Sequence, residues 1–492
     1  MKCTDRLLTA IAVSALFAAF ASAVPTTTRI SVAADGTEGN NYSGYYGIAL
    51  SDNGQYAAFG SDASNLVPGD TNGKTDIFRR NNQTGEIALI SVGYDGSPAN
   101  DRTTNPCISA DGRWVAFASR ATNLVENDTN GKSDVFVRDM LYGVTTRISV
   151  SPTGIQGDRD STSQSISADG RWVAFLSGAT NLVPGDVNGM ADIFLRDMYT
   201  DTTTLISLSS TGIQTNSTSN APAISADGRY VAFASLASNL SEADKNTHWD
   251  IFLRDTHTGT TTMVSVRSDG TQGAVSNSYS PSVDRLGRYV VFESYVPDLV
   301  PNDTNSDRDI FAHDSLSGFT TAVSVGMDTA VGNKQSNAAG IDSAGRYVVF
   351  FSDSTNLVPD DTNGQGDIFV RDLQNSVTSL VSVAWNGSQG NSASYSPAIS
   401  RDGLYVAYAS DATNLVQNDT NGMTDIFLYG PLFEASVPFD MADAEKALRI
   451  AGGLYNPTEA AYVRCNVDPD TGVTFADAVN IARKVAGVDP NP

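Results

Sequence analysis

The hydrophobic pattern between residues 26 and 430 consists of short apolar runs that return at a nearly constant interval. The runs are rich in Val, Ile, Phe and Thr and are bounded by Gly, Asp or Asn, a pattern typical of short β-strands separated by turns. The tripeptide Asp-Ile/Val-Phe marks one run in each unit, beginning at Asp76, Asp134, Asp192, Asp250, Asp309, Asp367 and Asp425. The intervals between these aspartates are 58, 58, 58, 59, 58 and 58 residues, so one structural unit occurs seven times.

Each unit contains four strand-like segments. In the second unit they are residues 105–109, 113–119, 134–139 and 145–150, and a long polar connection joins the second segment to the third. No amphipathic helical pattern occurs between residues 26 and 430. Seven units of four strands without helices predict an all-β fold, a seven-bladed β-propeller that occupies residues 24–430. The constant period also indicates that no unit carries an insertion longer than one residue.

The two ends of the repeat array predict how the ring closes. The seventh unit lacks its fourth strand, because residues 425–429 run directly into Gly430-Pro431. A matching fourth strand, residues 26–32, stands alone at the start of the array. We therefore expect the N-terminal segment to complete the last blade, which leaves no strand edge unpaired.

Three repeated phrases connect the chain to a known group of propellers. They are Ser-Ala-Asp-Gly-Arg-Tyr-Val-Ala-Phe at 225–233, Asp-Ile-Phe-Val-Arg-Asp at 367–372 and Thr-Thr-Arg-Ile-Ser-Val at 145–150. Across residues 26–430 the chain resembles the TolB-type, WD-like propeller repeat of bacterial periplasmic and secreted proteins. That group includes interaction scaffolds, peptidase accessory domains and polysaccharide-degrading enzymes, so the resemblance implies a fold and leaves the function open.

The beginning of the chain predicts export from the cytoplasm. Residues 1–23 have a positively charged start, a short apolar stretch and an Ala-Ser-Ala cleavage site, as in a secretory signal peptide. We expect a secreted, periplasmic or cell-surface protein, and no other apolar run is long enough to cross a bilayer. The only cysteines after the signal are Cys107 and Cys465, so a disulfide framework is not expected.

The charge balance restricts the partners. The chain has 31 Lys and Arg against 55 Asp and Glu, which gives a net charge of −24. Such a surface repels the phosphates of nucleic acids and of anionic lipids. We expect a monomer whose partner is an extracellular protein or a polysaccharide.

An acidic motif lies between the second and third strands of every unit: Asp, one residue, Asn, three residues, Asp. Carboxylate and amide oxygens on alternate residues of a loop are ligands that calcium prefers. The strongest copy is the fifth, with Asp303, Asn305, Asp307 and Asp309. The alternative is a metal-free turn held by Asp and Asn side chains, and Lys74 and Lys132 in two copies oppose cation binding.

Aromatic residues occur on the propeller face that should carry these loops. The blade-to-blade connections share that face, and the aromatic and imidazole side chains on or near it are Tyr45, Tyr46, Tyr279, Tyr395, His248 and Trp249. Together with Asn and Asp they would suit a sugar or a peptide ligand. The alternative is that each ring packs against the rim of its own blade.

The pattern becomes helical after Pro431. Residues 440–452 and 475–487 are two copies of an amphipathic segment that ends in Gly. Before the second copy, the oxygen-bearing residues at loop positions one, three, five and twelve are Asn466, Asp468, Asp470 and Asp477. Residues 431–492 thus resemble the dockerin family, which implies an EF-hand-like calcium loop and docking to a cohesin-like domain of another protein.

This sequence departs from the dockerin pattern in two respects. Thr471 occupies the loop position that is normally Gly, with Gly472 one place later, and the first helical copy lacks an acidic loop. The resemblance therefore implies one calcium ion in the C-terminal module. A metal-free helical hairpin is the alternative.

No known catalytic motif stands out. The three histidines, His248, His257 and His313, all lie within the repeat pattern, and the chain has no nucleophile elbow, zinc-protease motif or phosphate-binding loop. We therefore assign no catalytic residue and predict a secreted, non-catalytic binding or scaffold protein. The alternative is a carbohydrate-active enzyme, a glycosidase or polysaccharide lyase, of an extracellular degradation system.

Overall fold

The computed structural model describes residues 25–432, except residues 275, 302, 304, 327 and 328. The predicted signal peptide and all but the first two residues of the predicted module at 431–492 lie outside the described residues. The four predicted calcium ligands there are Asn466, Asp468, Asp470 and Asp477, and they stay predictions. In the described part of the chain, no helix is long and apolar enough to cross a membrane.

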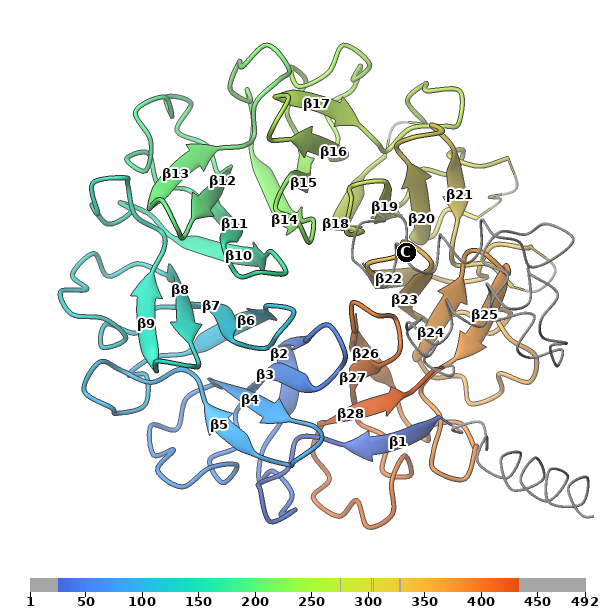
Figure 1. Cartoon of the computed structure of the whole chain (residues 1–492). Helices are drawn as coiled ribbons and strands as arrows, with labels where there is room; N and C mark the ends of the chain where they lie inside the picture. Colours follow the sequence, from blue (N-terminus) through green and yellow to red (C-terminus); the bar gives the residue numbers. More distant parts are fainter. Residues whose placement is uncertain (1–24, 275, 302, 304, 327–328, 433–492) are drawn as a thin grey trace, which may run out of the picture. The chain divides into compact units, whose positions relative to one another are not determined.

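Seven antiparallel sheets of four strands each form a ring (Figure 1). The first blade contains β2 (Ser43–Leu50), β3 (Tyr56–Ser61), β4 (Asp76–Asn81) and β5 (Ile87–Leu89). The second blade contains β6 (Thr103–Ile108), β7 (Trp114–Ser119), β8 (Asp134–Asp139) and β9 (Val144–Arg147). The third blade contains β10 (Ser161–Ile166), β11 (Trp172–Ser177), β12 (Asp192–Asp197) and β13 (Thr202–Leu205).

The next three blades repeat this plan. The fourth blade contains β14 (Ser219–Ile224), β15 (Tyr230–Ser235), β16 (Asp250–Asp255) and β17 (Thr260–Met263). The fifth contains β18 (Ser278–Val283), β19 (Tyr289–Ser294), β20 (Asp309–Asp314) and β21 (Thr320–Ala322). The sixth contains β22 (Ser336–Ile341), β23 (Tyr347–Ser352), β24 (Asp367–Asp372) and β25 (Val377–Leu380). In each blade the first strand lies nearest the axis of the ring (Figure 1).

The seventh blade joins the two ends of the array. It contains β26 (Ser394–Ile399), β27 (Val406–Ser410), β28 (Asp425–Gly430) and, as its outermost strand, β1 (Thr26–Arg29). The antiparallel register runs from Thr26 opposite Gly430 to Arg29 opposite Phe427. The predicted seven-bladed propeller and its closure by the N-terminal segment are both confirmed.

A pair of buried aromatic rings forms the centre of each blade. Phe59 of β3 and Phe78 of β4 are fully buried, with their ring centroids 6.0 Å apart. The equivalent pair recurs around the ring, with Tyr408 and Phe427 in the seventh blade. Burial of one such side chain stabilises the fold by about 1.5–3 kcal/mol, so the repeated aromatic pair makes a large contribution to the stability of each blade.

Backbone hydrogen bonds connect each blade to the next. Thr103 N, at the start of β6, donates to Thr75 O, just before β4 of the preceding blade, at 3.0 Å. The same bond closes the ring, from Ser43 N to Thr424 O at 3.0 Å. These bonds lie at the end of the blades where the acidic loops begin, so they fix the acidic loops against the neighbouring blade.

Candidate ligand-binding face

The asparagine of each acidic motif acts as a turn residue. In the first blade, Asn72 Nδ2 donates to Asp76 Oδ2 at 2.6 Å and to Ala99 O of the next connection at 2.9 Å. Its Oδ1 accepts a hydrogen bond from Lys74 N at 2.8 Å. The same Asn–Asp bond is present in the second, third, fifth, sixth and seventh blades. The asparagine thus holds the third strand of its blade to the next blade-to-blade loop.

The fifth loop, the strongest calcium candidate from the sequence, follows this scheme. Asn305 directs its amide N–H groups to Asp309 Oδ2, at 3.1 Å, and to Gly332 O. Asn305 Oδ1 accepts from Asp307 N at 2.7 Å, and Asp307 is exposed. Burial, together with the charge of Asp303, raises the pKa of Asp309 to about 7. Calcium binding by this set of four stays a prediction.

The first blade carries an insertion that the repeat period did not reveal. In the second blade, Thr103 pairs with Ser119, sixteen positions later, whereas Ser43 pairs with Ser61, eighteen positions later. The two extra residues fall in the bulge of β2 that contains Tyr45. The expectation that no insertion exceeds one residue is therefore wrong.

The sequence contained a signal for this insertion. The fourth-strand segments end at Val32, Val92 and Val150, which are 60 and then 58 residues apart. The intervals between Asp76 and the later aspartates missed the insertion, because it precedes the first of them.

The insertion builds a tyrosine cluster at the seam between the seventh and first blades. Tyr45 stacks on Tyr395 of β26, with centroids 5.5 Å apart and planes 22° apart. Tyr42 meets Tyr45 edge-on at 5.6 Å. Tyr42 and Tyr45 are 44% and 51% exposed, so the cluster faces solvent. The sequence predicted Tyr45 and Tyr395 on this face, but missed Tyr42.

Polar contacts fix the orientation of these rings. Tyr395 Oη lies 2.9 Å from Asp411 Oδ1 and 3.0 Å from Thr424 Oγ1. Thr424 Oγ1 in turn lies 3.2 Å from Tyr45 Oη. Burial and the neighbouring Asp411 raise the pKa of Tyr395, so its hydroxyl stays protonated. The contacts with Asp411 and Thr424 therefore fix the orientation of the stacked rings of Tyr45 and Tyr395.

A polar hollow of about 630 Å³ lies at the boundary of the first and second blades. Asp62 connects it to the tyrosine cluster, because Asp62 N donates to Tyr42 O at 2.9 Å. The lining of the hollow includes Asn40, Asp62, Lys74 and Arg102. The Arg102 guanidinium lies 5.7 Å from the ring centroid of Tyr46, which belongs to the bulge. Stacked rings next to amide, carboxylate and guanidinium groups offer both an apolar face and hydrogen-bonding partners to a polar ligand.

The remaining predicted side chains lie together in a different part of the ring. Trp249 and Tyr279 meet at 6.2 Å at the boundary of the fourth and fifth blades. Trp249 also packs against the core there, and His248 Nδ1 lies 3.2 Å from Asn277 Oδ1. This pair forms part of the blade boundary.

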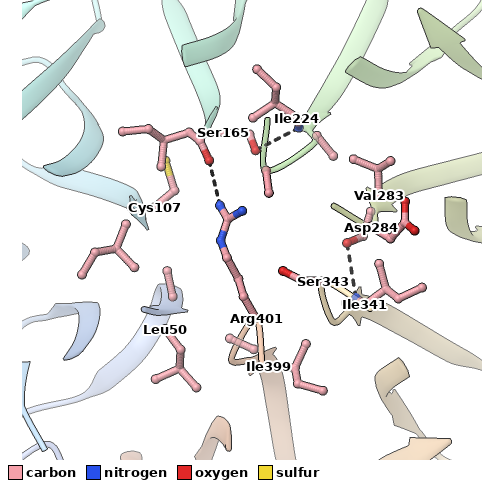
Figure 2. A pocket seen from close by; sticks show the side chains of 18 of the residues that line it. Leu50, Cys107, Ser165, Ile224, Val283, Asp284, Ile341, Ser343, Ile399 and Arg401 are labelled. Atoms are coloured by element: carbon pink, nitrogen blue, oxygen red, sulfur yellow. Dashed lines mark hydrogen bonds between the residues drawn. The ribbon is translucent and has the colours of Figure 1, made fainter. Parts of the chain in front are cut away.

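The axial channel is lined by the inner strands of all seven blades and encloses about 320 Å³. Apolar side chains such as Leu50, Ile224 and Ile399 line it together with charged side chains, among them Asp284 and Arg285. Arg401 reaches across it toward the third blade and donates to Ile166 O at 3.0 Å (Figure 2). Burial lowers the pKa of Arg401. This side chain divides the channel.

The histidines do not converge. His313 is buried in β20 with Nδ1 2.9 Å from Thr320 Oγ1, whereas His257 is exposed in the turn after β16. His248 lies in the acidic loop of the fourth blade. Among the described residues, no group of three or more His, Cys, Asp or Glu side chains is arranged to hold a metal ion.

No family model and no curated protein matches the chain. Among solved structures, an oligogalacturonate lyase in complex with manganese is 12% identical, covering 82% of this chain and 93% of that chain, with a TM-score of 0.48. An oligogalacturonate lyase from Vibrio parahaemolyticus is 13% identical, with coverages of 82% and 93% and a TM-score of 0.49. A putative TolB from Agrobacterium tumefaciens is 16% identical, with coverages of 56% and 79% and a TM-score of 0.36. Similarities at this level carry no argument about activity, and the seven-bladed architecture rests on this chain's own strand pairing.

Proposed function

We propose that the chain is a secreted, non-catalytic binding protein that holds a glycan on the loop face of its propeller, at the seam of the seventh and first blades. One observation carries this proposal: the insertion in β2 presents Tyr45 as an exposed, stacked and hydrogen-bonded ring. The corresponding bulge in the other blades is two residues shorter. An aromatic surface that is held rigid and exposed to solvent is typical of a binding site.

The chemistry of the hollow favours a polyhydroxylated ligand. Asn40 and Asp62 offer donors and acceptors for hydroxyl groups, while Tyr45 offers a flat face for the C–H surface of a sugar ring. Lys74 and Arg102 would add a preference for an acidic sugar in this otherwise acidic protein. These groups bind and orient, and none is paired as a nucleophile with a base.

The two ends of the chain support a role outside the cytoplasm. The signal-like residues 1–23 would direct export to the periplasm, cell surface or medium. The dockerin-like module would attach the propeller to a cohesin-like domain, with calcium held by Asn466, Asp468, Asp470 and Asp477. Through this attachment the sugar-binding propeller would become part of an extracellular protein assembly.

A binding screen tests the proposal directly. The mature chain is applied to glycan and extracellular-protein arrays with calcium and with chelator, beside the variants Tyr45→Ala and Tyr199→Ala. Tyr199 is 84% exposed in the turn after β12, on the opposite face, and serves as the matched control. We expect binding that is lost in Tyr45→Ala and kept in Tyr199→Ala. Equal binding by both variants would refute the assigned site.

A further inference from the structure

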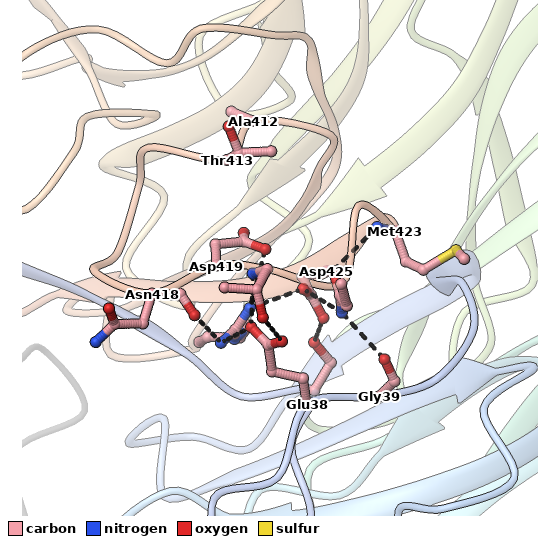
Figure 3. A network of polar contacts seen from close by, with 12 residues as sticks. Glu38, Gly39, Ala412, Thr413, Asn418, Asp419, Met423 and Asp425 are labelled. Carbon is pink, nitrogen blue, oxygen red and sulfur yellow. Dashed lines mark hydrogen bonds and ion pairs between the residues drawn. The ribbon is translucent and has the colours of Figure 1, made fainter.

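Every blade pairs a buried carboxylate that begins the third strand with a second carboxylate of the acidic loop, which is buried or partly buried. In the second blade they are Asp128 and Asp134, and Arg147 of β9 joins them. Its Nη1 lies 3.0 Å from Asp128 Oδ1 and 3.4 Å from Asp134 Oδ2. In the seventh blade Arg29 does the same, 3.2 Å from Asp419 Oδ1 and 3.1 Å from Asp425 Oδ2 (Figure 3).

A glutamine replaces the arginine in two other blades. In the third blade, Gln214 Nε2 donates to Asp186 Oδ1 at 2.9 Å and to Asp192 Oδ2 at 3.0 Å. In the fourth blade, Gln272 Nε2 lies 3.3 Å from Asp244 Oδ1 and 2.8 Å from Asp250 Oδ2. Four blades therefore place a nitrogen donor between the same two oxygens, a position that we call the bridging point.

The first blade has no side chain that can fill its bridging point. The strand position of Arg147, opposite the central Phe of the third strand, is Leu89, opposite Phe78. Gln214 of the third blade pairs with Leu208 in an isolated β-bridge, and the residue at the same position in the first blade is Pro98, paired with Val92. Neither Leu89 nor Pro98 carries a donor group.

The two carboxylates of the first blade are nevertheless buried. Asp70 is 8% exposed, and its Oδ1 is buried without a hydrogen-bond partner. The equivalent atom of Asp128 contacts Arg147. Asp76 is fully buried and accepts from Ser91 Oγ at 2.5 Å and from Asn72 Nδ2 at 2.6 Å. Burial, with the charge of Asp70 adding to it, raises the pKa of Asp76 to about 6.

We propose that a hard metal cation, with calcium as the best match, occupies the bridging point of the first blade, held by Asp70 Oδ1 and Asp76 Oδ2 and completed by water. A buried carboxylate oxygen needs a hydrogen-bond donor or a cation as its partner, and carboxylate oxygens are the ligands that calcium prefers. The arginines of the second and seventh blades show that a positive charge fits at this point. Two protein carboxylates alone make a weak site, which would be filled at millimolar calcium.

The sixth blade shows why the first is the clearest case. It also lacks the arginine, with Leu380 in its place, but Gln389 is present beside Asp361 and Asp367. Its Nε2 donates to Asp360 O at 2.8 Å, and Asp361 Oδ1 is buried without a hydrogen-bond partner. The sixth blade therefore has a glutamine at the donor position, although in this structure it does not bridge the two carboxylates. The fifth blade carries neither donor, with Ala322 and Val331 at the two positions, but its Asp303 is only partly buried. The first blade also carries neither donor, and both of its carboxylates are buried.

Thermal unfolding of the mature full-length chain tests the proposal. The wild type, Leu89→Arg, Asp70→Asn and the control Leu205→Arg are melted in 10 mM calcium chloride and in chelator at equal ionic strength. Leu205 occupies the same strand position in the third blade, where Gln214 already fills the bridging point. Any calcium bound by the C-terminal module contributes equally to all four proteins.

We expect calcium to raise the propeller transition of the wild type and of Leu205→Arg by about 1–2 °C more than that of Leu89→Arg or Asp70→Asn. In chelator, Leu89→Arg should melt above the wild type, since its guanidinium supplies the missing charge. If calcium shifted the melting temperature of all four proteins equally, the proposal would be overturned. The bridging point of the first blade would then hold a proton shared by Asp70 and Asp76. If Leu89→Arg does not fold, the shift of Asp70→Asn alone decides between these outcomes.

Discussion

The regular blades, second to sixth, and the seam formed by the seventh and first blades are built on the same strands but tied together differently. In the second blade, Arg113 forms an ion pair with Asp139 at 2.7 Å and lies 4.6 Å from the ring centroid of Trp114. Equivalent pairs in the other regular blades are Arg171–Asp197, Arg229–Asp255, Arg288–Asp314 and Arg346–Asp372. Each regular blade therefore fastens its own second strand to the end of its third.

The seam lacks this fastening and has others in its place. The equivalent positions are Gln55 and Asn81 in the first blade, and Leu404 and Gly430 in the seventh. Instead, Arg29 connects the N-terminal strand to the acidic loop of the seventh blade. The tyrosine cluster also lies at the seam, and the unfilled bridging point of the first blade lies near the boundary with the second blade. The contacts that hold a single blade together are thus repeated from blade to blade, whereas ring closure and the tyrosine cluster occur where the copies differ.

Removing β1 should have the largest effect on the seam. Deletion of residues 25–32 exposes the edge of β28 and removes Arg29 and Ser31 from buried Asp425. We expect the deletion variant to lose the cooperative thermal transition of the wild type, measured by circular dichroism. Thr28→Ala, at an exposed position of β1, is the control and should melt like the parent. A deletion variant that also melts like the parent would show that the ring does not depend on this strand.

Removing the seam arginine should come next in size. Arg29→Ala leaves Asp419 and Asp425 buried without their positive partner and should cost about 3–5 kcal/mol in the free energy of unfolding, from urea denaturation. Arg147→Ala makes the same change in a regular blade. Since Arg29 also pairs with Glu38, we expect its loss to cost at least as much. A loss below about 1 kcal/mol in both variants would contradict the account of the bridging point.

A pH series separates the first blade from the second. The pKa of Asp76 is raised from 3.8 to about 6 in the folded chain, so the folded state binds the proton more tightly. The stability that this contributes is present below pH 4 and is lost as the pH rises through 6, at most about 3 kcal/mol. In chelator, the free energy of unfolding of the wild type should therefore fall relative to Leu89→Arg between pH 4 and pH 7. The other carboxyl groups with a raised pKa titrate in both proteins, so they do not change the difference between them. If the free energy of unfolding followed the same pH profile in both proteins, Asp70 and Asp76 would not be a pair that lacks a positive partner.

The smallest effect on stability is expected at the tyrosine cluster. Tyr45 is half exposed, so Tyr45→Ala should change the free energy of unfolding by less than about 1 kcal/mol. Phe78→Ala, in the buried pair of the same blade, should cost about 3–5 kcal/mol. Urea denaturation of both variants measures the contrast. A large loss in Tyr45→Ala would make its ring a structural element rather than a binding surface.

The ring and its closure were predictable from the sequence, because a missing fourth strand at one end and a spare one at the other leave a single solution. The role of the acidic motif was not predictable from the sequence, because the same Asp and Asn side chains can bind a metal ion or stabilise a turn. Only coordinates show that Asn72 donates its amide to Asp76.

The site at the seam was only partly predictable. Tyr45 and Tyr395 are far apart in the sequence, and ring closure alone predicts that they approach; their stacking depends on the bulge in β2. The replacement of Arg147 by Leu89 is visible when the units are aligned. The replacement removes the positive partner of two buried carboxylates. This consequence could not be predicted from the repeat period, because it depends on how far an arginine side chain extends.

The central claim is that ligand binding is concentrated at the seam, and one measurement tests it most directly. The dissociation constant of the strongest glycan found on the array is measured by calorimetry for the wild type, Tyr45→Ala and Tyr199→Ala. The account predicts a loss of affinity of about tenfold or more for Tyr45→Ala, or about 1.4 kcal/mol, with no change for Tyr199→Ala. Identical constants for all three proteins would contradict it.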